Sequence, residues 1–166
     1  MKNENNKINN MNIGINTNEV SLEDCFIYNQ KTELFNGENK NFCNICKQLC
    51  DSLYTSKIYS CPNVLVLIIN RGKNNMYNVK LNFEEIIDIT KYVSLKDGQV
   101  VYNLTGVITH YGESGPNAHF MAFCKSPINN NWYRYNDAFV TDVKNFKEEI
   151  IDFGTPYILF YKKVNG

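Results

Sequence analysis

The order of apolar and polar positions predicts a fold built mainly from β-strands. Residues 118–124 alternate as a half-buried strand does, and residues 132–137 are rich in aromatic side chains. Between them, residues 126–131 hold a proline, a serine and three asparagines. Strand-like runs on either side of such a turn-forming cluster predict a β-hairpin.

This hairpin brings together two residues with chemical potential. If its tip is centred on Pro127 and Ile128, His119 lies directly opposite Asn136. Residues that face each other in this way share a face of the sheet, with Cβ atoms about 4.5–5.5 Å apart. An imidazole held by a side-chain amide is half of a nucleophilic hydrolase site.

Further strands are predicted along most of the chain. The run Ser21–Asp24 resembles a capping box that begins a short helix ending near Tyr28. The very apolar segment 64–69 predicts a strand covered on both faces. Other strands are predicted at residues 77–83, 100–110 and 156–162, a weak helical pattern at 143–153, and an ambiguous segment at 84–92. This order predicts an α+β fold that is mostly antiparallel β-sheet.

Composition limits the domain organisation and the classes of partner. The 166 residues suit one domain at 21–166, preceded by a disordered, asparagine-rich segment at 1–20. Seventeen basic and seventeen acidic side chains balance, so neither a nucleic acid nor an acidic membrane is the expected partner. No apolar run approaches the ~20 residues that span a bilayer. Without a signal-peptide pattern, an intracellular location, cytoplasmic or nuclear, is expected, with the six cysteines reduced.

Several motifs resemble those of the ubiquitin-specific proteases, which are papain-like cysteine peptidases. The resemblance rests on four segments around the histidine and on three upstream segments in the family's order. These are residues 102–112, 118–120, 132–137 and 156–161, and upstream 43–46, 62–71 and 77–80. It covers roughly residues 21–162 and corresponds to the C-terminal half of such a catalytic domain. The expected architecture is the palm and part of the fingers, with the helical thumb absent.

The resemblance implies a thiol-dependent deubiquitinase that cleaves the isopeptide bond after the ubiquitin C-terminus, with ubiquitin or ubiquitinated proteins as partners. His119 is then the general base and the general acid, roles that an imidazole can fill near neutral pH. Asn136 is expected to accept a hydrogen bond from Nδ1–H of His119, which leaves Nε2 facing the thiol. Asp137 ranks third, either assisting the site or serving as a turn carboxylate. His110 is expected to be structural or to lie near the substrate.

No cysteine of the chain is recognisable as the nucleophile. Cys25 directly follows two acidic residues, which disfavour a thiolate. Cys124 lies five residues along the strand from His119, on the opposite face and roughly 16 Å away. The family's Gly-Asn-Thr-Cys-type motif does not occur in this sequence. The missing thumb segment is therefore expected to carry the nucleophile. The alternatives are a catalytically inactive ubiquitin-binding module and a truncated, non-functional fragment.

A pair of cysteines has the spacing of a zinc knuckle. Cys43 and Cys46 can bind one tetrahedral zinc, and the resemblance matches them to the second half of a zinc ribbon in the fingers. Two further ligands are needed, and Cys50 and Cys61 are the candidates to substitute for the missing pair. No cofactor is expected to be required for the chemistry, and the zinc would be structural.

Three positions depart from the family's pattern without removing His119 or Asn136. Ala118 replaces a glycine, Phe120 replaces the more frequent tyrosine, and Gly72 stands where phenylalanine is common. The methyl group of Ala118 is expected to narrow the channel for the ubiquitin tail.

Overall fold

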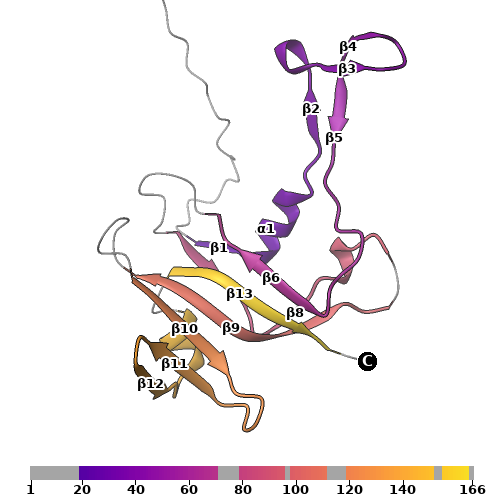
Figure 1. Cartoon of the computed structure of the whole chain (residues 1–166). Helices are drawn as coiled ribbons and strands as arrows, with labels where there is room; N and C mark the ends of the chain where they lie inside the picture. The colour runs from indigo at the N-terminus through magenta and orange to yellow at the C-terminus, as the bar shows by residue number, and fades with distance from the viewer. Residues whose placement is uncertain (1–18, 71–78, 96–97, 112–118, 152–154, 165–166) are drawn as a thin grey trace, which may run out of the picture.

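A computed structural model describes residues 19–70, 79–95, 98–111, 119–151 and 155–164. Its main feature among these residues is a seven-stranded sheet in which every neighbouring pair is antiparallel, as the sequence predicted (Figure 1). The strand order is β12-β11-β10-β9-β13-β6, and β8 also pairs with β9. The strands are β6 (Val64–Ile68), β8 (Ile86–Asp88), β9 (Val101–Tyr111), β10 (His119–Lys125), β11 (Trp132–Asn136), β12 (Phe139–Asp142) and β13 (Thr155–Lys163).

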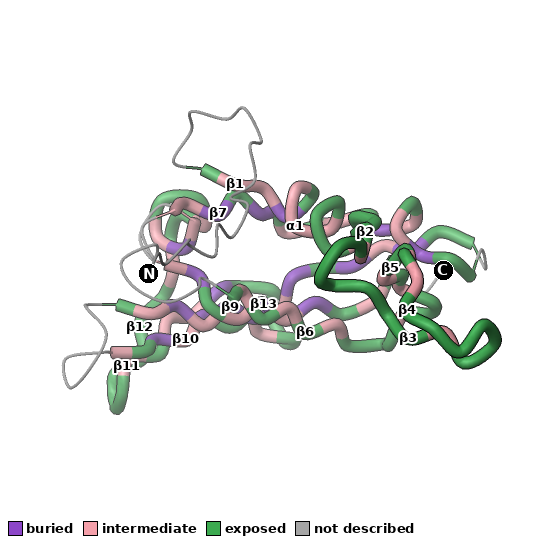
Figure 2. Tube along the Cα trace, turned by 90° about the horizontal axis from the view of Figure 1, so that it is seen from above, coloured by how far each residue is buried: buried purple, intermediate pink, exposed green. Residues whose placement is uncertain are grey.

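A smaller layer covers one side of this sheet. It contains helix α1 (Leu22–Asn29) and the parallel pair of β1 (Glu19–Ser21) and β7 (Lys80–Asn82). Figure 2 shows this layer running along the sheet, with buried positions between the two. The fully buried side chains come mainly from the central strands: Tyr102, Leu104, Val107, Phe123, Leu159 and Tyr161. Two short helical turns lie outside the strands of this sheet: the 3₁₀ turn Thr90–Tyr92 and the π-helical turn Lys147–Ile151.

The capping box predicted at Ser21 begins α1. The backbone N–H of Asp24 donates to Oγ of Ser21 at 3.1 Å, and the backbone N–H of Ser21 donates back to Oδ2 of Asp24 at 2.9 Å. These reciprocal bonds satisfy two backbone donors that the first helical turn leaves without a partner. Glu19 and Val20, which the sequence placed in the disordered lead-in, form β1 with Ser21, and residues 1–18 lie outside the described residues.

The segment of the chain that connects α1 to β6 forms an arm that projects from the sheet (Figure 1). It consists of two antiparallel pairs and a 3₁₀ turn, and many of its apolar side chains are exposed. The sequence predicted an irregular region here, because strands of three residues are too short to show a period. The elements are β2 (Glu33–Phe35), η1 (Gly37–Asn39), β3 (Asn41–Cys43), β4 (Gln48–Cys50) and β5 (Ser52–Tyr54).

The prediction that segment 64–69 is covered on both faces is wrong. β6 is the last strand of the sheet, and its side chains alternate between half-buried and exposed. Leu65 and Leu67 pack against the core, whereas Val66 and Ile68 are 46% and 68% exposed. The weak helical pattern at 143–153 gives only the short turn at Lys147–Ile151 among the described residues. No helix in the described part of the chain is long and apolar enough to span a membrane.

Candidate functional site

The structure brings His119 and Asn136 together. Nε2 of His119 lies 2.5 Å from Oδ1 of Asn136, and both side chains are half-buried. His119 begins β10 and Asn136 ends β11, so both stand at the same end of the hairpin. The bond is short and partly shielded from water, which favours one defined orientation of the imidazole ring.

The register that produces this contact differs from the predicted one by two residues. β10 and β11 pair Ala122 with Tyr135 and Lys125 with Trp132, so the turn is centred between Ile128 and Asn129. His119 therefore reaches Asn136 diagonally instead of from the directly opposite position. Because side chains alternate with a period of two, a shift of two residues keeps both on the same face of the sheet.

The ring nitrogen that meets Asn136 is the opposite of the one predicted. Nδ1 was expected to donate to the amide, but the structure places Nε2 beside it. An amide oxygen only accepts hydrogen bonds, so Nε2 carries the hydrogen and the neutral ring keeps its lone pair on Nδ1. Nδ1 is therefore the atom available to a thiol, and the correction exchanges the roles of the two nitrogens.

Asp137 occupies a turn. It is exposed, and its φ of +51° lies in the left-handed region between Asn136 and Phe139, which pair at the end of the β11–β12 hairpin. Aspartate tolerates this region better than most residues. Within the part of the chain that the structure describes, no hydrogen bond joins Asp137 to His119. The geometry favours a turn residue over a direct partner of the imidazole.

His110 lies on the other face of the sheet from His119. It pairs with Phe120 across β9 and β10, and the two rings meet edge to face with centroids 5.0 Å apart. Phe120 also contacts the ring of Tyr157 at 5.7 Å. These contacts give His110 a packing role in an aromatic cluster. Ala118 and Gly72, two of the positions that depart from the family's pattern, lie outside the described residues.

The structure distributes the cysteines away from His119. Cys124 is on the opposite face of β10, and burial raises the pKa of its thiol, which disfavours the thiolate. Cys25 and Cys61 line a cavity beside β6, a strand that lies three positions from β10 in the sheet. At about 4.8 Å per strand this separation is about 14 Å. The other three cysteines are in the projecting arm.

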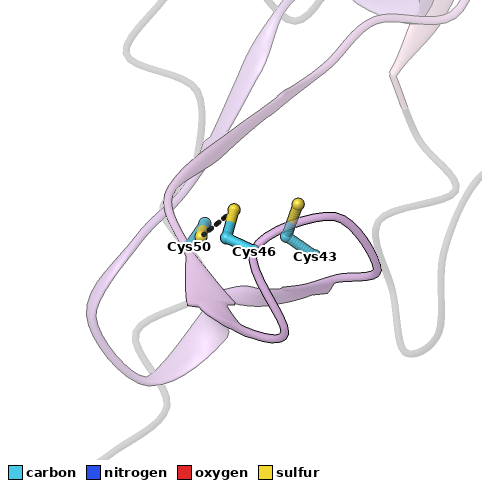
Figure 3. A group of neighbouring side chains, drawn as sticks. All are labelled: Cys43, Cys46 and Cys50. Atoms are coloured by element: carbon cyan, nitrogen blue, oxygen red, sulfur yellow. Dashed lines mark hydrogen bonds between the residues drawn. The ribbon is translucent and has the colours of Figure 1, made fainter.

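Those three cysteines form a cluster that suits a metal ion. The Sγ atoms of Cys43, Cys46 and Cys50 lie within 4.8 Å of one another, and the Cys46 and Cys50 sulfurs are 3.7 Å apart (Figure 3). Four thiolates around tetrahedral zinc, each about 2.3 Å from it, have sulfurs about 3.8 Å apart. The structure therefore adds Cys50, and not Cys61, to the predicted pair. The spacing of Cys46 and Cys50, four residues apart on a hairpin, was the signal in the sequence.

The backbone of the arm favours a thiolate at one of the three. The backbone N–H and the thiol of Cys46, together with the backbone N–H of Ile45, lower the pKa of Cys43. Hydrogen bonds to the other two sulfurs raise the pKa of Cys46, which keeps its proton longer. The turn closes at Lys47, whose N–H donates to the carbonyl of Cys43 at 2.8 Å and whose φ is +55°. A turn that aims N–H groups at a sulfur prepares it to bind a cation.

Comparison with known proteins identifies the family of this chain. The profile described as ubiquitin carboxyl-terminal hydrolase matches residues 4–161, which is nearly the whole chain. The chain belongs to the ubiquitin carboxyl-terminal hydrolase family. The rat protein "Ubiquitin carboxyl-terminal hydrolase 48" is 29% identical over 136 residues, which cover 78% of this chain and 13% of that protein.

Solved structures support the fold. The SAGA Ubp8/Sgf11/Sus1/Sgf73 DUB module bound to ubiquitin aldehyde contains a chain that matches with a TM-score of 0.70 and 23% identity. A SAGA DUB module bound to monoubiquitin matches with a TM-score of 0.68, also at 23% identity. Each match covers 89% of this chain and 35% of the other chain. The chain thus spans about a third of these relatives and a smaller share of the rat protein.

Proposed function

We propose that His119 and Asn136 form the base half of a deubiquitinase active site whose nucleophilic cysteine lies outside this sequence. The observation that carries the proposal is the 2.5 Å contact between Nε2 of His119 and Oδ1 of Asn136 in a chain of this family. The contact leaves Nδ1 as the basic atom. None of the chain's own thiols occupies the same end of the hairpin, so an outside thiol completes the site.

The reaction follows from this arrangement. Nδ1 of His119 takes the proton of the incoming thiol, and Asn136 holds the imidazolium that forms. The thiolate attacks the carbonyl carbon of the ubiquitin C-terminus, and the imidazolium gives its proton to the nitrogen that leaves as the C–N bond breaks. Water, deprotonated by the same imidazole, then hydrolyses the thioester and restores the thiol.

Ubiquitin is the proposed partner because two of the structurally similar modules are described as bound to ubiquitin aldehyde and to monoubiquitin. The test is hydrolysis of a fluorogenic ubiquitin C-terminal amide by this chain joined to the polypeptide that supplies the cysteine. Asn136→Ala should lower kcat by 10²-fold or more, and Asn136→Asp should retain most of it. Equal activity in the wild type and in Asn136→Ala would refute the role of the amide.

A second candidate is a module that binds ubiquitin without chemistry. It is favoured by the separation of the six cysteines from His119. Two measurements test this candidate. Titration of ¹⁵N-labelled chain with ubiquitin should give saturable shifts if the chain binds ubiquitin. The protein joined to the cysteine-bearing polypeptide should then show no turnover, which separates a binding module from a deubiquitinase. The absence of any shift at millimolar ubiquitin would remove this candidate.

We also propose that Cys43, Cys46 and Cys50 hold a structural zinc ion. The donor set fits, since three sulfurs already lie within 4.8 Å of one another. The ion would tie β3 to β4 in an arm that has little apolar core, and it would take no part in the reaction. Cys50→Ser should lower bound zinc per chain, whereas Cys124→Ser should not. An unchanged zinc content in Cys50→Ser would remove Cys50 from the ligand set.

A further inference from the structure

Within the described ranges, the outer edge of β6 carries backbone groups that lack hydrogen-bond partners. Ile69 N–H donates to Tyr157 O at 2.9 Å, and Lys163 N–H donates to Asn63 O at 2.8 Å. In an antiparallel ladder these bonds fix the alternation, so residues 63, 65, 67 and 69 point their backbone groups at β13. The N–H and C=O groups of residues 64, 66 and 68 therefore point away from the sheet. Among the described residues, no hydrogen bond satisfies them.

A cavity lies against this edge. Its volume is about 360 Å³, and every residue from Leu65 to Ile69 lines it. Cys25, Phe26 and Asn29 of α1 also line it, and Cys61 stands in the segment that enters β6. The cavity therefore runs along the strand between the β6 edge and the helix.

The chemistry of the cavity selects its occupant. Of the described residues, no lysine, arginine, aspartate or glutamate lines it, and its polar side chains are those of Asn29 and Ser60 beside the two thiols. A charged side chain placed there would lose its hydration without gaining a partner. The side chains that fit are uncharged and apolar.

In the part of the chain that the structure describes, β6 also lacks the features that usually block the edge of a sheet. Exposed edge strands are commonly protected by lysine, proline, a bulge or a covering segment. The sequence of β6 is Val-Leu-Val-Leu-Ile, and its pairing with β13 is regular. Val66 and Ile68 remain 46% and 68% exposed beside the unpaired backbone.

We propose that this edge binds an extended, uncharged peptide segment that adds a further strand to the sheet. Its backbone pairs with residues 64, 66 and 68, and its inward-facing side chains, at every second position, fill the cavity between β6 and α1. The site lies three strands from His119, so it is separate from the proposed catalytic pair. An arginine-rich or acidic segment does not fit, because the described lining of the cavity offers no opposite charge.

Amide hydrogen exchange, read residue by residue by NMR, tests this proposal on the chain itself. The probe is a blocked six-residue peptide that alternates valine and threonine. At saturating peptide, exchange of the Val66 and Ile68 amides should slow by tenfold or more. The amide of Leu67 already bonds to β13 and serves as the internal control. Unchanged exchange at Val66 with millimolar peptide would overturn the proposal.

Two controls identify the occupant and the mode of binding. A peptide N-methylated at every amide, which offers β6 no backbone donor from either edge, should give no protection. Equal protection by it would mean apolar adhesion and would refute strand addition. Val66→Pro removes one outward donor without removing a bond to β13, and should weaken peptide binding while the far-UV spectrum is retained. Protection that appears without peptide and rises with protein concentration would mean that a second copy is the occupant, and would also refute the proposal.

Discussion

His119 and Asn136 form their hydrogen bond diagonally across the β10–β11 hairpin. The ladder, extended by one pair beyond Ala122 and Tyr135, puts Met121 and not His119 opposite Asn136. A diagonal contact uses the reach of both side chains and still keeps them on one face of the sheet. The imidazole consequently meets the amide through its far nitrogen, Nε2.

This geometry predicts the tautomer of His119. Because Oδ1 of Asn136 accepts from Nε2–H, the neutral ring should carry its hydrogen on Nε2 and its lone pair on Nδ1. Long-range ¹H–¹⁵N correlation of the neutral histidine ring reports the tautomer directly. His110, which packs on Phe120, provides the comparison within the same spectrum. A His119 ring protonated on Nδ1 would contradict the assignment.

The sequence predicted the contact but not the register. Its alternation and turn residues place a hairpin between residues 118 and 137, and the period of two fixes which side chains share a face. The tip could not be located, because the loop is stabilised by local bonds that composition does not reveal. Ser126 N–H donates to Asn131 O, Asn130 N–H donates to Ser126 O, and Asn130 has a φ of +59°.

Burial of β6 was mispredicted for a different reason. A continuous apolar run is typical of a strand covered on both faces, but it does not say whether the strand is central or at an edge. That position is decided by tertiary pairing, which here puts β13 on one side of β6 and a cavity on the other. The third cysteine of the arm was also ambiguous, because only folding of β3 against β4 selects Cys50 over Cys61.

The capping box predicts a contribution to stability that depends on pH. The Ser21 hydroxyl, and then the Ser21 backbone N–H, lower the pKa of Asp24 in the folded state. Stabilisation by a carboxylate with a depressed pKa is present above its unfolded pKa of about 3.9 and is lost as pH falls through the folded value. Ser21→Ala should lower the free energy of unfolding at pH 7 by about 1 kcal/mol.

The loss should be smaller at pH 2, where Asp24 is protonated and the main bond that the variant still removes is the one from the Asp24 N–H to Oγ of Ser21. Denaturant unfolding at the two pH values measures the difference, and Asp24→Asn should reproduce it. An equal loss at both pH values would show that the carboxylate does not take part in the cap.

The arm predicts an order of thiol reactivity. Because hydrogen bonds, first from the backbone N–H of Cys46, lower the pKa of Cys43 and raise that of Cys46, Cys43 holds more thiolate at neutral pH. In metal-free protein, brief treatment with iodoacetamide should modify Cys43 before Cys46, as peptide mass spectrometry can show. Faster modification of Cys46, the more exposed side chain, would mean that access and not the thiolate fraction controls the rate.

The core predicts a contrast between two phenylalanines of the sheet. Phe123 on β10 is fully buried, whereas Phe139 on β12 is 74% exposed. Phe123→Ala should lower the free energy of unfolding by about 3–5 kcal/mol, through lost burial and a residual cavity. Phe139→Ala should change it by less than about 0.5 kcal/mol. Similar losses in the two variants, measured by urea unfolding, would contradict the burial of Phe123.

The most direct test of the catalytic account is covalent capture of ubiquitin by an electrophile at its C-terminus. The protein tested is this chain joined to the polypeptide that supplies the cysteine. His119→Ala should reduce the labelling rate by 10²-fold or more, because no base then activates the thiol. His110→Ala, which removes the histidine on the opposite face, should label at nearly the wild-type rate. Undiminished labelling of His119→Ala would contradict the assignment of His119 as the base.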